Sequence, residues 1–241
     1  MQFLLRKAGR YLPLITLGLV ALNILSWFLR REFYLFRYIP LLTVLVFLIY
    51  YIIKAPRIRF IVIAILVMLA LREYSVFYYY KNFGQIAYIL LGCVTYSLII
   101  IKRLDMFNAF LKDRAAILLT LVFIGLNMLI LNELISQVKE GYEGSFQSGL
   151  VFLFGVIISL LGAIAVLYNQ VVNSDRSLAF LFFVFCFIFS DVASLLGYYF
   201  GISFFYYIDF VSAALGLAFF IYTVLDVDNK EEGKNQLTQS Y

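Results

Sequence analysis

The sequence predicts an all-α fold, a polytopic integral membrane protein built as a bundle of eight transmembrane helices. The first observation is the composition, since 64% of the 241 residues are hydrophobic and only 14% are charged. The second is that apolar runs long enough to cross a hydrocarbon core of about 30 Å recur along the whole chain. The third is that the short alternating segments typical of a transmembrane β-barrel are absent from the sequence.

Eight apolar runs, joined by short connections, define the predicted helices. The predicted spans are 11–29, 38–53, 58–79, 84–101, 115–135, 149–168, 178–199 and 203–225. The longest connection between them is SQVKEGYEGSFQS, which carries Gly141 and Gly144. We therefore expect one transmembrane domain over residues 1–225, followed by a polar, disordered tail over residues 226–241 that lies outside the membrane.

The first four spans are apolar runs that follow basic segments. The first follows the basic start MQFLLRKAGR and has no small-residue cleavage site after it, so a retained helix is expected. The second and fourth are short, and their helices can extend into the flanking residues. The third carries Arg72 and Glu73 near its outer end. Either this helix continues past both residues, or it ends at Leu71 and both side chains are solvated in a loop.

The last four spans contain most of the polar residues that the membrane would enclose. The fifth carries Asn127 and Asn132, with Glu133 near its outer end, and the sixth is apolar. The seventh and eighth each hold one aspartate, Asp191 and Asp209, in an otherwise uncharged run. A charged side chain near the bilayer centre costs at least a few kcal/mol. Such a residue therefore faces the interior of the bundle and has a partner.

The positions of the Lys and Arg residues predict the orientation, because positive charge accumulates on the cytoplasmic side. Six of the 19 lie on one side, which leaves 13 on the side of the N-terminus; the six are Arg30, Arg31, Arg37, Arg72, Lys81 and Lys139. Both termini are then cytoplasmic. We expect the protein in a bacterial inner (cytoplasmic) membrane, in contact with membrane lipids.

Several classes of function are excluded by composition. The chain has no His, which removes Ser-His-Asp triads and most transition-metal sites, so neither a metal nor a cofactor is expected. The net charge of +5 does not indicate a nucleic-acid partner, because the cations lie between apolar runs. Cys93 and Cys186 both lie inside apolar runs and are interpreted as core residues rather than as a disulfide. No glycine-rich phosphate loop occurs.

The intramembrane carboxylates fall at similar depths. Asp191 lies ten positions before Gly201, and Asp209 lies eight positions after it. At about 1.5 Å per residue, the two carboxylates are roughly 15 Å and 12 Å below the turn. Glu73 and Glu133 fall in the same outer half of the bundle. The sequence therefore predicts an outward-opening polar cavity, while the simpler interpretation is that the polar residues only pack helices together.

Three segments resemble the YhhN/lysoplasmalogenase family of eight-helix membrane proteins. FIFSDVASLLGYYFG is similar to the family's Ser-Asp segment on helix seven and contains Ser190 and Asp191. RYIPLLTVLVFLIYY resembles an early Lys-Pro-Leu segment, with Ile39 in place of Lys. ILLGCVTYSLII resembles a Gly-His-x-x-Tyr segment that keeps Gly92 and Tyr96, with Cys93 in place of His. The family's Gly-Asp on helix three falls at Arg72 and Glu73.

The resemblance implies cleavage of the vinyl ether bond of a lysophospholipid. This reaction requires one protonated and one ionised carboxyl group, as glycoside hydrolysis does. The predicted catalytic residues are Asp191, Glu73 and Asp209. The predicted substrate-binding residues are Arg72, Tyr96 and Ser190. Two other functions stay open, namely a non-catalytic membrane protein of the same fold and a transporter of protons or small solutes.

The predicted topology can be tested with reporter fusions. A reporter joined to the tail at residues 226–241 is expected to give a cytoplasmic signal, because 13 of the 19 Lys and Arg residues lie on the same side as both termini. A fusion in the connection that contains Glu140 and Glu143 serves as the control and is expected to read out on the opposite side. A non-cytoplasmic signal from the tail would overturn the predicted orientation.

Overall fold

The computed structural model consists of helices joined by short turns in the residues it describes. These are residues 11–28, 33–79, 81–103, 112, 114–137, 145–202 and 204–239. Eight α-helices and one 3₁₀ helix lie within these ranges, which contain no strand. Each α-helix overlaps one of the predicted spans, in the same order along the chain. The predicted all-α fold is therefore confirmed for the described residues.

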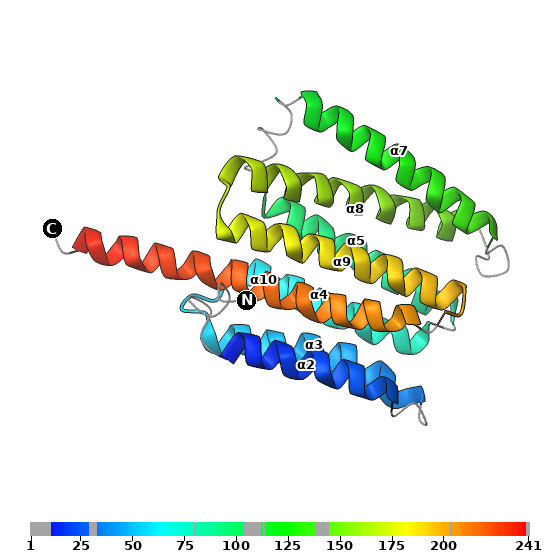
Figure 1. Cartoon of the computed structure of the whole chain (residues 1–241), viewed down its shortest axis with the longest axis horizontal. Coiled ribbons are helices and arrows are strands. Elements are labelled where there is room, and N and C mark those ends of the chain that lie inside the picture. Colours follow the sequence, from blue (N-terminus) through cyan, green and yellow to red (C-terminus); the bar gives the residue numbers. More distant parts are fainter. Residues whose placement is uncertain are drawn as a thin grey trace. The chain divides into compact units, whose positions relative to one another are not determined.

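Apolar runs determine where the helices lie (Figure 1). Their bounds are α2 Tyr11–Phe28, α3 Phe33–Lys54, α4 Phe60–Ser75, α5 Asn82–Ile101, α7 Arg114–Gln137, α8 Ser145–Val172, α9 Asp175–Tyr199 and α10 Phe204–Gln239. Five spans are long and apolar enough to cross a membrane, namely Phe60–Tyr78, Phe83–Ile101, Ser148–Val172, Asp175–Tyr198 and Phe204–Leu225. Three shorter apolar stretches lie in α2, α3 and α7. This part of the chain is that of an integral membrane protein.

The structure decides where two of the helices end. Helix α4 continues to Ser75 and passes into the 3₁₀ helix η1, Val76–Tyr78. Arg72 is only 3% exposed, so the interpretation that the helix ends at Leu71 with a solvated Arg72 is wrong. The predicted disordered tail is also wrong as far as Gln239, because α10 continues through it (Figure 1). Its Lys, Glu and Gln residues favour helix, and extending an existing helix avoids the unfavourable nucleation step.

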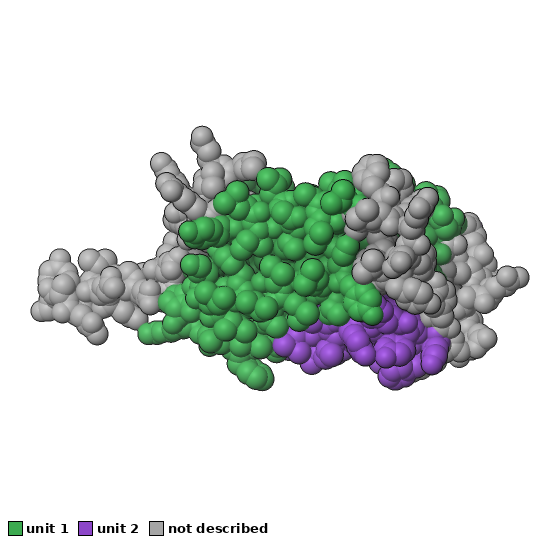
Figure 2. All heavy atoms as spheres, turned by 90° about the horizontal axis from the view of Figure 1, so that it is seen from below, with its two compact units in different colours: residues 1–66, 173–241 green, residues 67–172 purple. Residues whose placement is uncertain are grey.

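The chain forms two compact units (Figure 2). The first contains residues 1–66 and 173–241, and the second contains residues 67–172. In the first unit, α10 packs against α9, α2 and α3. Phe183, Phe187 and Phe220 form its aromatic core, with ring centroids 4.9 Å apart for Phe183 and Phe220. Helices α2 and α3 are also joined by the Asn23 amide, which donates to Thr43 Oγ1 at 3.4 Å.

In the second unit, α8 packs against both α5 and α7. Ile89 and Cys93 of α5 form a buried cluster with Leu150 and Val151 of α8. Helix α7 is joined to α8 by Asn127, whose amide donates to Gly155 O and Ser159 Oγ, both at 3.0 Å. Asn127, one of the polar residues noted in the fifth span, therefore joins two helices, as small polar residues often do in membranes.

The close packing of α9 and α10 makes a stability prediction. A Cβ atom at Gly216 would lie 2.6 Å from Phe187 Cδ2 and 3.2 Å from Cys186 Cβ. Overpacking of this kind typically costs about 1–3 kcal/mol, so Gly216→Ala is expected to lower the thermal midpoint of the purified protein in detergent. Gly18→Ala in α2 is the matched control, because no atom lies within 4 Å of its Cβ. Equal midpoints for the two variants would contradict the tight contact.

Candidate functional site

A hydrogen bond between two membrane helices is the centre of the first candidate cluster. Ser190 Oγ on α9 donates to Asp209 Oδ1 on α10. Ser190 is buried, and Asp209 is half-buried. Asp191, the next residue on α9, is 9% exposed. Asp191 and Asp209 were predicted to lie at similar depth. The contact between Ser190 and Asp209 confirms that this part of α10 lies beside the part of α9 that carries Asp191.

The local sequence explains why α9 and α10 meet in this register. Helix α9 begins with a capping box, in which the Ser174 hydroxyl accepts from Ser177 N and the Ser177 hydroxyl accepts from Ser174 N. It ends at a short turn in which Gly201 has a φ of 66°. This backbone conformation favours glycine because a Cβ atom is strained there. A short turn between two antiparallel helices leaves little freedom in their relative depth.

The second candidate cluster surrounds a buried cation in the second unit. The Arg72 guanidinium donates from Nη2 to Tyr88 Oη at 2.5 Å and from Nη1 to Tyr96 Oη at 3.1 Å. Its carbon atom lies 4.3 Å from the ring centroid of Tyr88, 5.8 Å from that of Tyr96 and 5.7 Å from that of Phe154. Cation–π contacts of this kind stabilise a desolvated guanidinium by about 2 kcal/mol. We call Arg72, Tyr88, Tyr96 and Phe154 the Arg72 cluster.

Two members of the Arg72 cluster, Arg72 and Tyr96, were predicted to bind substrate. The structure brings these two side chains into direct contact. Sequence reasoning missed Tyr88 and Phe154. The spacing of Tyr88, Gly92 and Tyr96, each four residues apart on α5, is the signal that the sequence offers. Gly92 leaves room for the ring of Phe154, since a Cβ atom there would lie 2.6 Å from Phe154 Cε2.

The other predicted site residues are distributed over both units. Asp191, Ser190 and Asp209 belong to the first unit, whereas Arg72, Tyr96 and Glu73 belong to the second. Glu73 is half-buried, and Glu133 is exposed. The cavity that these residues were expected to share remains a prediction. Cys93 and Cys186 are free thiols, as expected. Among the described residues, no group of three or more Cys, Asp or Glu side chains is arranged to hold a metal ion.

The hydrogen bond between Arg72 and Tyr96 can be tested by removing one oxygen atom. Tyr96→Phe keeps the ring but deletes an acceptor of a buried cation, which is expected to cost about 1–3 kcal/mol of stability. Tyr74→Phe is the matched control, because its hydroxyl contacts Tyr78 Oη at 3.2 Å on the exposed surface. Thermal unfolding of both variants in detergent gives the comparison. An unchanged thermal midpoint for Tyr96→Phe would show that the hydrogen bond between Arg72 and Tyr96 does not stabilise the folded protein.

No protein family matches the chain, and neither does any curated protein or solved structure. The likeness to lysoplasmalogenases therefore stays a prediction from the short segments around Pro40, Gly92 and Asp191. The two clusters described above are the structural basis for a functional proposal.

Proposed function

We propose that the chain is an eight-helix membrane hydrolase that cleaves the vinyl ether of a lysophospholipid by carboxylate acid–base chemistry. The lengths of the remaining three helices support eight spans. Helices α2, α3 and α7 have 18, 22 and 24 residues. At about 1.5 Å per residue they extend for roughly 27–36 Å, which is comparable with the ~30 Å hydrocarbon core. With eight spans, both termini lie on one side of the membrane.

The observation that carries the proposal is the contact between Ser190 and Asp209 beside the buried Asp191. It brings two carboxylates from adjacent helices to one level inside an apolar hairpin. Packing alone needs neither charge, because a Ser or Asn would form the same kind of hydrogen bond at a lower desolvation cost. A pair of carboxylates is, however, what acid–base hydrolysis of an enol ether or acetal carbon requires.

In the proposed reaction, Asp191 transfers its proton to the β-carbon of the vinyl ether. The ether oxygen then stabilises the resulting oxocarbenium ion. A second carboxylate, Asp209, accepts a proton from water while the water oxygen bonds to the α-carbon. The hemiacetal formed in this way returns its hydroxyl proton to Asp191 as its bond to the glycerol oxygen breaks, and Asp209 gives its proton to that oxygen. The products are a long-chain aldehyde and a glycerophosphodiester, and no oxidant or reductant is consumed.

The Arg72 cluster has the chemistry required to hold the phosphate of such a substrate. An arginine guanidinium offers five N–H donors in a planar fork that suits phosphate oxygens. Tyr88 and Tyr96 accept hydrogen bonds from Arg72, which orient its guanidinium. In the proposal, the Arg72 cluster is a phosphate-binding group of the second unit, and Ser190 orients Asp209 in the first.

A non-catalytic membrane protein of the same fold is the second candidate. It is favoured by Asn127, because this intramembrane amide joins α7 to α8 and has no need of a chemical role. The Ser190–Asp209 contact could likewise serve only to join α9 to α10. Transport is a weaker alternative, because α8, α9 and α10 are each continuous, whereas many transporters bind substrate at interrupted helices.

The activity test compares three single substitutions on a lysoplasmalogen substrate. Asp191→Asn and Asp209→Asn are expected to lower turnover by roughly 100- to 10,000-fold, because an amide cannot exchange a proton in acid–base catalysis. Asn at position 209 retains an oxygen that can accept from Ser190, so the fold is expected to persist. Asp175→Asn is the matched control, since Asp175 is exposed in the first turn of α9.

Turnover of lysoplasmalogen and thermal midpoints are measured on the same preparations. If the wild-type protein and Asp191→Asn turn over the substrate at the same rate, Asp191 is not a catalytic residue. Absence of turnover in the folded wild-type protein would instead favour the non-catalytic candidate. In that case, Asp191→Asn is expected to leave the thermal midpoint unchanged or to raise it, because the substitution removes a buried charge.

A further inference from the structure

The connection between α3 and α4 is a short, well-fixed turn. We call Lys54–Arg59 the α3–α4 turn. Both ends of it are bonded to one buried residue, Tyr51, which is 0% exposed. Ala55 N donates to Tyr51 O at 2.8 Å, and Arg59 N donates to the Tyr51 hydroxyl at 3.0 Å. A turn held from both sides presents its side chains with little loss of conformational entropy on binding.

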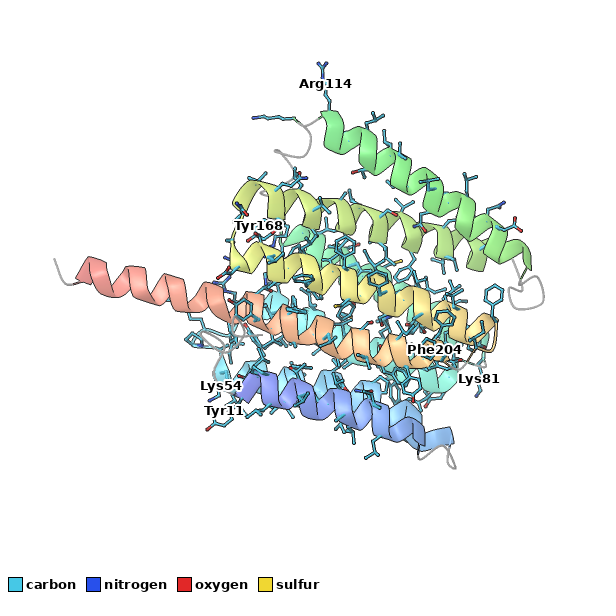
Figure 3. The ribbon with its side chains drawn as sticks, in the orientation of Figure 1. Tyr11, Lys54, Lys81, Arg114, Tyr168 and Phe204 are labelled. Carbon is cyan, nitrogen blue, oxygen red and sulfur yellow. The ribbon has the colours of Figure 1, made fainter. Side chains whose placement is uncertain are left out.

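The α3–α4 turn carries positive charge with no acidic residue near it in the sequence. No Asp or Glu occurs between Phe33 and Arg72. Lys54 and Arg57 are both exposed. Within the described part of the chain, the contact that the structure records for the Lys54 ammonium is the Tyr11 ring, 5.6 Å from its centroid (Figure 3). This contact brings the start of α2 beside the end of α3 and leaves the ammonium at the surface.

Apolar side chains are exposed directly beside these cations. Ile53 is 70% exposed and Phe60 is 85% exposed, one before the turn and one after it. Ile58, within the turn, is also exposed. Large exposed apolar side chains that alternate with Lys and Arg at the end of a membrane helix are typical of the boundary between headgroups and acyl chains. A soluble anion or a nucleic acid would satisfy the cations but would leave Ile53, Ile58 and Phe60 in water.

We propose that the α3–α4 turn is a binding surface for anionic phospholipids. Lys54 and Arg57 contact the phosphate and the charged headgroup, and Ile53, Ile58 and Phe60 contact the upper acyl chains. The surface is separate from the residues of the proposed hydrolase. It therefore selects the lipids around the protein rather than the substrate, and it holds whether or not the chain hydrolyses a lysolipid.

The test measures lipid binding by the full-length protein in detergent with native mass spectrometry. The probes are phosphatidylglycerol and phosphatidylcholine with identical acyl chains. Each Lys or Arg near an anionic membrane surface contributes about fivefold in affinity. Lys54→Gln combined with Arg57→Gln is therefore expected to weaken phosphatidylglycerol binding by roughly 25-fold relative to the wild type. Binding of phosphatidylcholine is expected to stay the same.

Lys81→Gln is the matched control, because Lys81 is an exposed cation that follows the opposite end of α4. It is expected to keep the wild-type preference for phosphatidylglycerol. Tyr51→Phe removes the hydrogen bond to Arg59 N and is expected to reduce the preference by a smaller factor than the double substitution. Melting curves verify that every variant is folded.

Four results would overturn the proposal. One is a wild-type protein that binds both lipids equally. The second is a double variant of Lys54 and Arg57 that retains the preference. The third is an equal loss in Lys81→Gln, which would indicate a response to net charge alone. Competition by inorganic phosphate at the lipid concentration would also contradict it, because the surface would then bind a soluble anion rather than a lipid.

Discussion

A bilayer offers no hydrogen-bond partner to a polar group in its core, and this constraint organises the whole chain. Helices satisfy their own backbone, so every described segment long and apolar enough to span is helical. Polar side chains in these helices bond to a carbonyl of their own helix, as Thr16 and Thr95 do, or to partners on neighbouring helices. Asn127 bonds to Gly155 and Ser159, Ser190 bonds to Asp209, and Arg72 bonds to two tyrosines. Each bond joins two helices within one unit.

These pairings differ in what they require chemically. The Asn127 amide and its partners are neutral, so helix packing accounts for them fully. Arg72 and the two aspartates carry ionisable groups, whose burial in hydrocarbon is much less favourable. The aromatic rings around Arg72 reduce that penalty, as they offer both hydroxyl acceptors and polarisable faces. Retaining ionisable groups at such positions is the physical reason for proposing a reaction there rather than packing alone.

Glycine controls how closely the helices approach. Gly216 allows α10 to contact Phe187 and Cys186 of α9, and Gly92 allows Phe154 of α8 to reach α5 beside Tyr96. In lipid, where no hydrophobic effect drives helices together, close contact of this kind provides much of the packing energy. The hydrogen bond between Ser190 and Asp209 and the stack of Tyr96 on Phe154 therefore depend on residues that have no side chain of their own.

The apolar runs of the sequence determined the order and approximate bounds of the helices in the described part of the chain, because burial in lipid depends on local composition. The similar distances of Asp191 and Asp209 from Gly201, ten and eight positions, also predicted that they lie at similar depth on their two helices. Only the tertiary structure decided that Arg72 is buried, because its partners come from other helices, Tyr88 and Tyr96 from the next α-helix and Phe154 from α8. The end of α4 was decided there too. Polar residues at a helix end are compatible with either helix or loop, and only their neighbours select between the two.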